Sequence, residues 1–128
     1  MSGLRLHKIL IITLLSNCIF LASSLTSAHE MTEQFIPIGM SPGISNKYSY
    51  IGNISGVDRA SNTILMRADD STITISISPS TRIWLDRSKM KKTNIDASFD
   101  ELEVGRRIEV MHSRKDANTA VWIKIESS

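Results

Sequence analysis

Two of the three histidines in the sequence could take part in metal chemistry. If a signal peptide is cleaved after Ala28, His29 becomes the first residue, and its α-amino group and imidazole form the bidentate nitrogen chelate that copper favours. His112 and the thioethers of Met31 or Met40 could complete such a site. The competing interpretation is that the terminus stays disordered and that His112 is a rim histidine at a strand end.

Two tryptophans form a second candidate site. Trp84 and Trp122 each have a parity opposite to that of their apolar neighbours in an alternating strand, so both rings are predicted to point outward. Outward tryptophans on a small barrel could form a stacking or apolar platform for a ligand. The alternative is a second small core, in which Phe35, Ile36 or the turn at Phe99 covers the rings.

A basic cluster follows the first tryptophan. Basic residues beside an outward tryptophan can hold single-stranded nucleic acid, and they could equally meet anionic glycans or lipid head groups. A solvated loop is the simpler interpretation of such a cluster. The cluster consists of Arg82, Arg87, Lys89, Lys91 and Lys92. The predicted ligand-binding residues are Trp84, Trp122, Arg82, Arg87 and Lys89.

The sequence contains no motif that commits it to catalysis. A nucleophile elbow, a zinc-protease helix, a phosphate loop and a dinucleotide fingerprint are all absent from it. Paired acids occur at Asp69-Asp70 and Asp100-Glu101, but both pairs lie in expected turns, where carboxylates are ordinarily solvated. The chain is therefore predicted not to be an enzyme, and no cofactor is expected unless copper binds at His29.

Residues 1–28 have the order of a secretory signal. Arg5 and Lys8 precede an apolar run that ends at Leu25, and small residues follow up to Ala28. A retained anchor would need a longer apolar run, and lipidation of Cys18 would need a small residue before it. We expect cleavage before His29, a periplasmic or secreted product, and no stable membrane anchor.

The charge of the mature chain argues against a nucleic-acid partner. Loss of Arg5 and Lys8 reduces the 15 basic residues to 13, against 13 acidic ones, so the mature domain is formally neutral. Nucleic acid requires a net basic face. Cys18 leaves with the signal, and the mature domain then has no disulfide, no thiolate nucleophile and no cysteine-bound metal.

The remaining residues divide into an arm and a β domain. Residues 29–46 place two prolines and two glycines among apolar residues, which predicts an extended N-terminal arm lying on the domain or on a partner. Residues 47–128 repeat apolar positions every second residue, most cleanly at 72–77, which predicts six strands in a meander. Residues 94–102 lack this alternation and predict one short helical turn.

These elements predict an all-β fold, a small five- or six-stranded OB-like barrel, because closure removes exposed sheet edges. Turn and core positions recur in the segments Gly52-Asn53-Ile54, Val57-Asp58, Asn62-Thr63-Ile64, Thr81-Arg82-Ile83, 101–110 and 120–125. In these segments the chain resembles the exported bacterial OB-like barrel domains of unknown function, over about residues 49–126. The resemblance implies a fold and a compartment, and it carries over no catalytic residue.

The sequence therefore predicts an exported, non-catalytic binding or accessory module. Its ligand or protein partner in the cell envelope is not specified by the residues. One alternative is a periplasmic copper-handling protein that uses His29. Another is a structural accessory whose apolar arm docks on a larger complex.

Overall fold

The computed structural model describes residues 32–41 and 48–128. The chain divides into two compact units, Met1–Glu33 and Gln34–Ser128. Only Thr32 and Glu33 of the first unit are described, and both are helical. Within the described residues, no helix has the length and hydropathy needed to cross a membrane. The predicted signal at 1–28 and the residue His29 lie outside the described residues.

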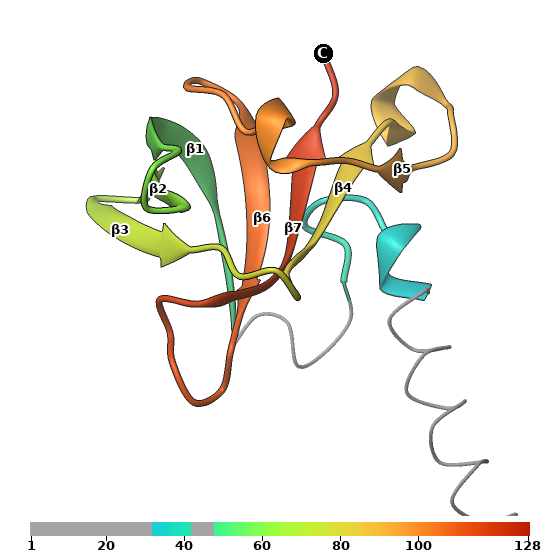
Figure 1. Cartoon of the computed structure of the whole chain (residues 1–128). Helices are drawn as coiled ribbons and strands as arrows, with labels where there is room; N and C mark the ends of the chain where they lie inside the picture. The colour runs from blue at the N-terminus through green and yellow to red at the C-terminus, as the bar shows by residue number, and fades with distance from the viewer. Residues whose placement is uncertain (1–31, 42–47) are drawn as a thin grey trace, which may run out of the picture. The chain divides into compact units, whose positions relative to one another are not determined.

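The second unit is built almost entirely of β-strands (Figure 1). Two single-turn 3-10 helices interrupt them, η1 at Ser88–Met90 and η2 at Phe99–Glu101. The strands are β1 (Ser49–Asp58), β2 (Thr63–Ala68), β3 (Ser71–Ser76), β4 (Arg82–Asp86), β5 (Ile95–Asp96), β6 (Arg107–His112) and β7 (Ala120–Glu126).

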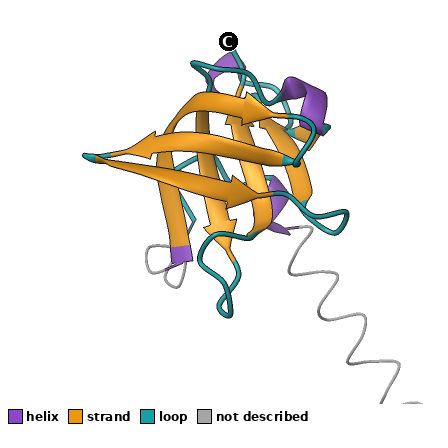
Figure 2. Cartoon of the chain, turned by 60° about the vertical axis from the view of Figure 1, so that its left-hand side comes forward, coloured by secondary structure: helices purple, strands orange, loops and turns teal. Residues whose placement is uncertain are grey.

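The strands close into a barrel (Figure 2). Their order in the sheet is β3-β2-β1-β6-β7-β4-β5. A parallel bridge joins Ser76, at the end of β3, to Thr119, just before β7, and the Ser76 N–H donates to the Asn118 carbonyl at 2.6 Å. The ring β1-β2-β3-β7-β6 is thereby complete, which confirms the predicted all-β, OB-like barrel.

The predicted strict meander is wrong in one respect. β4 continues the direction of β3 and pairs with β7 in parallel, with Ile83 opposite Ile123. Because a parallel partner needs a crossover, the chain between β4 and β7 crosses the barrel end through β5, η2 and β6. The two-residue strand β5 and the helix η1, at Ser88–Met90, were not predicted.

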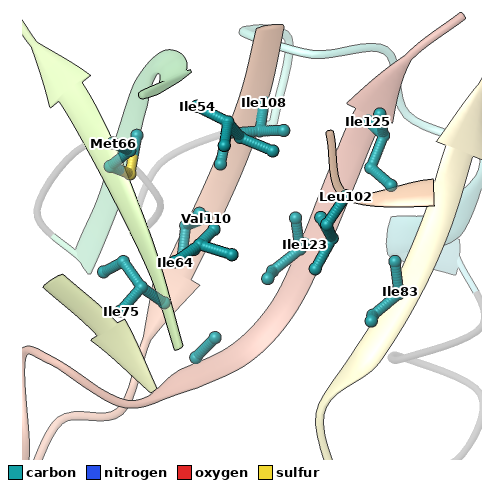
Figure 3. Close-up of a cluster of buried hydrophobic side chains, with 11 residues drawn as sticks. Ile54, Ile64, Met66, Ile75, Ile83, Leu102, Ile108, Val110, Ile123 and Ile125 are labelled. Carbon is teal, nitrogen blue, oxygen red and sulfur yellow. The ribbon is translucent and has the colours of Figure 1, made fainter. Parts of the chain in front are cut away.

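The barrel core consists of the inward residues of every long strand (Figure 3). Leu102 is fully buried directly after η2. The Ser98 side chain and Glu101 form a capping box on this helix, as the predicted turn requires. Val121 departs from the predicted inward pattern and is 40% exposed. The buried core residues are Ile54, Ile64, Met66, Ile75, Ile83, Leu102, Ile108, Val110, Ala120, Ile123 and Ile125.

β1 bends so that it can pair with both β2 and β6. A bulge shifts its register with β2 between Ile54 and Gly56. At Gly52 a Cβ atom would collide with the backbone carbonyl of Arg67 on β2. Glycine at position 52 therefore permits the close backbone approach at which the strand bends.

Candidate functional site

The outer face of β6, β7 and β4 carries the candidate site. The register places Glu109 of β6 and Trp84 of β4 on either side of Lys124 of β7. Residues on both sides of Lys124 in sequence point into the barrel core, so Lys124 points outward. It is nevertheless 0% exposed, and Glu109 is 2% exposed. Something must therefore cover this face.

The cover is the part of the predicted arm that the structure describes, residues 34–41, called the arm segment below. It does not run extended as predicted. The Met40 N–H donates to the Pro37 carbonyl at 3.0 Å, and Gly39 has φ +80°, which together form a type II-like turn. Ile38, inside this turn, is buried. Figure 1 shows the arm segment beside β4 and β7.

Two carboxylates hold this turn. A β-turn leaves the N–H groups of its two central residues without partners inside the turn. Here Ile38 N–H donates to Asp86 Oδ2 at 2.8 Å, and Gly39 N–H donates to Glu109 Oε2 at 3.0 Å. Lys124 Nζ lies 3.2 Å from Ser41 Oγ. We refer to Asp86, Glu109 and Lys124 as the charged clasp.

The arm segment is also fixed at its start. The side-chain amide of Asn94 donates to the Gln34 carbonyl at 2.9 Å, and the Asn94 carbonyl oxygen accepts from the Arg87 N–H at 2.7 Å. Asn94 is itself buried. The insert between β4 and β5 thus supports the arm segment at a second point.

The two tryptophans lie together beneath this cover. The Trp84 and Trp122 ring centroids are 5.8 Å apart with an interplanar angle of 38°, and Lys124 Nζ is 4.5 Å from the Trp122 ring centroid. Trp84 is 3% exposed and Trp122 is 5% exposed. Their outward direction was predicted correctly, and the alternative of a second small core describes their burial.

The residues expected to form that cover are only partly correct. Phe35 is 53% exposed, and Phe99 packs against the barrel core rather than this face. Ile36 is half-buried in the arm segment. The buried residue of the arm segment is Ile38, an arm residue that was not among those predicted to cover the tryptophans. The ligand-binding role of the tryptophans stays a prediction, and a ligand would reach them only where the arm segment is displaced.

The predicted basic ligand-binding residues have different surroundings in the structure. Arg82 is exposed and lies opposite Trp122 in the β4–β7 register, so these two predicted residues are brought together. Arg87 Nε donates to the Thr93 carbonyl at 2.8 Å and closes its own loop. Lys89 forms an ion pair of 2.8 Å with Glu126. Ligand binding by Arg87 or Lys89 would have to compete with these contacts.

His112 is the last residue of β6. Its ring stacks on Tyr50 at 5.0 Å between centroids and meets Tyr48 edge-on at 5.7 Å. Its Nδ1 lies 2.8 Å from the Ser113 carbonyl, and the residue is 9% exposed. This packing agrees with the interpretation of a rim histidine.

The predicted copper ligands are not assembled in the part of the chain that the structure describes. Across residues 32–41 and 48–128, no group of three or more His, Cys, Asp or Glu side chains is placed to hold a metal ion. His29 and Met31 lie outside these ranges, and Met40 is 69% exposed. Copper binding at His29 stays a prediction.

Burial and hydrogen bonding act in opposite directions on the pKa of Asp86. Burial raises this pKa. Hydrogen bonds from Ser88 and from the Ile38 N–H, together with the positive charge of Lys124, lower it by more, so the pKa of Asp86 lies below its usual range. The ionised carboxylate is thus the form that holds the arm segment.

A pH dependence of stability follows from this lowered pKa. The stabilisation from Asp86 is present above its unfolded pKa of about 3.9 and is lost as the pH falls through the lower folded pKa. We expect the urea midpoint of the wild type to drop between about pH 4 and pH 2 more steeply than that of Asp86→Asn, which has no proton to take up. Equal slopes for the two proteins would contradict a charged Asp86 at the arm contact.

No family model and no curated protein matches this sequence. Among solved structures, the chain is similar to the crystal structure of Ag(I)CusF, with 19% identity and a TM-score of 0.44 over 60% of this chain and 93% of that chain. It is also similar to apo-CusF from Escherichia coli, with 18% identity and a TM-score of 0.45 over 62% of this chain and 87% of that chain. Neither similarity transfers a metal site to this chain.

Proposed function

We propose that this protein is an exported, non-catalytic binding module that recognises a short apolar turn of a partner protein in the cell envelope. The binding surface is the face formed by Trp84, Trp122 and the charged clasp. In this proposal the arm segment covers that surface within the same chain, and a partner segment binds the surface in its place.

One observation carries the proposal, namely the way in which the arm segment is held. Two consecutive backbone N–H groups, from Ile38 and Gly39, are donated to carboxylates on two different strands. Backbone N–H groups are present in any peptide. The two carboxylates therefore select a peptide by its turn conformation rather than by a particular side chain. The buried Ile38 adds an apolar anchor next to these donors.

The chemistry of the face also supports binding rather than mere structural cover. A surface that only needed covering could do so with apolar side chains, whereas buried charges are costly to desolvate unless they are paired and hydrogen-bonded. Asp86 and Glu109 accept hydrogen bonds from the arm segment, and Lys124 lies within hydrogen-bond distance of Ser41. Such a face discriminates between occupants, because an occupant whose backbone donors are misplaced does not make these hydrogen bonds to the buried carboxylates.

Export supports a partner in the cell envelope. Residues 1–28 have the order of a secretory signal, and the mature chain is formally neutral. A neutral module fits a protein segment held by backbone hydrogen bonds better than it fits a polyanion.

The two tryptophans provide the assay, because the chain has only these two and both lie on the proposed surface. In the full mature chain, Ile38→Asp should undock the arm segment and shift tryptophan emission to longer wavelength. A synthetic octapeptide with the sequence of residues 34–41 should then reverse the shift. It should bind this variant at least 10-fold more tightly than it binds the wild type, in which the covalently attached arm competes.

A matched peptide tests the contact itself. The same octapeptide with N-methyl groups on its second isoleucine and its glycine lacks the two donors used by Ile38 and Gly39, and it should bind at least 10-fold more weakly. Far-UV circular dichroism checks that the variant stays folded, and Ile38→Ala provides a milder variant if it does not. Equal binding of both peptides would mean that the two N–H donors do not carry the contact, and binding of neither to a folded variant would mean that the arm segment only completes the fold.

A further inference from the structure

A second surface feature lies next to η2 and shares no residue with the charged clasp. It is an open hollow of about 400 Å³, within the size range of small-molecule sites. The lining comes from the β1–β2 turn, the β3–β4 connection, β4 itself and the residues just before and within η2. The lining residues are Asn62, Ile77, Ser78, Pro79, Thr81, Ile83, Ala97, Ser98 and Phe99.

Hydrogen bonds fix the walls of this hollow. The Ile77 N–H donates to the Asn62 carbonyl at 2.9 Å, and the Ala97 N–H donates to the Ile83 carbonyl at 2.9 Å. The Arg59 guanidinium lies 5.4 Å from the centroid of the Phe99 ring and pairs with Asp100 at 3.2 Å. The hollow is therefore formed before any ligand arrives.

The lining selects against charged ligands. None of the nine lining residues carries a charge, and the nearby Arg59 and Asp100 neutralise each other. An ion entering the hollow would give up hydration without gaining a partner of opposite charge. The apolar residues Ile77, Ile83 and Phe99 favour a ligand with an apolar face.

The polar lining atoms require a ligand rich in hydrogen-bond donors. The Thr81 hydroxyl donates to the Ala120 carbonyl at 2.8 Å, and the Ser98 hydroxyl donates to Glu101 Oε2 at 2.7 Å. Each hydroxyl has thus used its proton, and each also accepts a backbone N–H, Thr81 from Ser78 at 3.0 Å and Ser98 from Asp100 at 3.3 Å. What each hydroxyl offers the ligand is its remaining lone pair. Asn62 has no side-chain hydrogen-bond partner within residues 32–41 and 48–128, so its amide can both donate and accept.

We propose that this hollow binds an uncharged sugar unit. A neutral hexose is donor-rich through its hydroxyl groups, and its C–H face packs on an aromatic ring such as that of Phe99. Adjacent hydroxyls can engage the donor and the acceptor of the Asn62 amide at once. The site is separate from the charged clasp and does not depend on the arm segment.

The test is a titration of the full mature chain with methyl β-glucopyranoside, followed by amide chemical shifts. We expect saturable shifts confined to the lining residues, and at least fivefold weaker binding of glucuronate and of glucosamine, which are charged analogues of similar size. Shifts that do not saturate, or that gather around Trp84 and Trp122, would overturn the assignment.

A pair of variants separates binding from folding. Asn62 and Asp69 are both turn residues with positive φ, +53° and +52°, so glycine fits the backbone at either position. Asn62→Gly removes the amide from the hollow and should weaken methyl β-glucopyranoside binding at least fivefold. Asp69→Gly, which is not part of the lining, should leave it unchanged. Equal affinities of the two variants would contradict the proposed role of the Asn62 amide, and sugar binding does not depend on whether the octapeptide binds.

Discussion

Replacing Lys124 with methionine should destabilise the protein by about 3 kcal/mol, because removing one partner of a buried charged group leaves the others uncompensated. Lys124 is 0% exposed, lies over the Trp122 ring and lowers the pKa of Asp86. Methionine preserves the length and apolar volume of the side chain but removes the positive charge that lowers the pKa of Asp86 and that lies opposite Glu109 in the β6–β7 register. Urea unfolding followed by far-UV circular dichroism at pH 7 measures the loss.

Two further proteins identify the cause of this loss. Adding Asp86→Asn to Lys124→Met should recover part of the stability, because one of the uncompensated carboxylates is then neutral. Lys89→Met removes a lysine that is also ion-paired, to Glu126 at 2.8 Å, but whose side chain is 69% exposed. Exposed ion pairs contribute about 0–1 kcal/mol, so this variant should stay close to the wild type. Equal losses for Lys89→Met and Lys124→Met would show that the clasp is not buried in solution.

Sequence alternation predicted the barrel well, because a strand with one face in a core repeats every second residue. Residues 72–77, with three isoleucines of one parity, fall in and just after β3, and Ile75 is fully buried. The parallel pairing of β4 with β7 was missed, because nothing within 82–86 or 120–126 reports strand direction. β4 and β7 are about 40 residues apart in sequence, and their pairing depends on closure of the whole barrel.

The candidate site could be predicted only in part, for the same physical reason. Alternation gave the outward direction of Trp84 and Trp122, but burial on the outer face depends on the arm segment. The contacts of Ile38 and Gly39 with Asp86 and Glu109 join residues 48 and 70 positions apart. Glu109 and Lys124 each stand between inward apolar residues, which predicts an outward charge. Only the folded chain shows that these charges are covered.

The arm turn was within reach of the sequence. Pro37 followed by Ile38 and Gly39 places glycine where a type II-like turn needs a positive φ. The prolines and glycines of residues 29–46 argue against helix and central strand, which is correct for residues 35–41. The prediction of an extended chain is wrong for this segment, because the same residues also favour a turn. A turn in this position leaves two donors free, and those donors form the contacts with the clasp.

Replacing Trp122 with alanine tests how firmly the arm segment covers the face. The ring is 5% exposed and packs on Trp84. Loss of a buried aromatic side chain costs about 3–5 kcal/mol when the cavity does not collapse. The arm segment is short enough to settle partly into the space, so we expect a loss of about 3 kcal/mol in urea unfolding. Val121→Ala, next to it on the same strand but at a 40% exposed residue, should cost less than about 1 kcal/mol.

The outcome bears on function as well as stability. A loss of this size means that the tryptophan face is a closed second core at rest, and that a partner must displace the arm segment before it can bind. The remaining Trp84 would then report the displacement in Trp122→Ala through its emission. A loss as small as that of Val121→Ala would mean that the ring is already open to solvent. A ligand could in that case reach Trp122 directly, and competition by the attached arm would no longer limit the binding of the octapeptide.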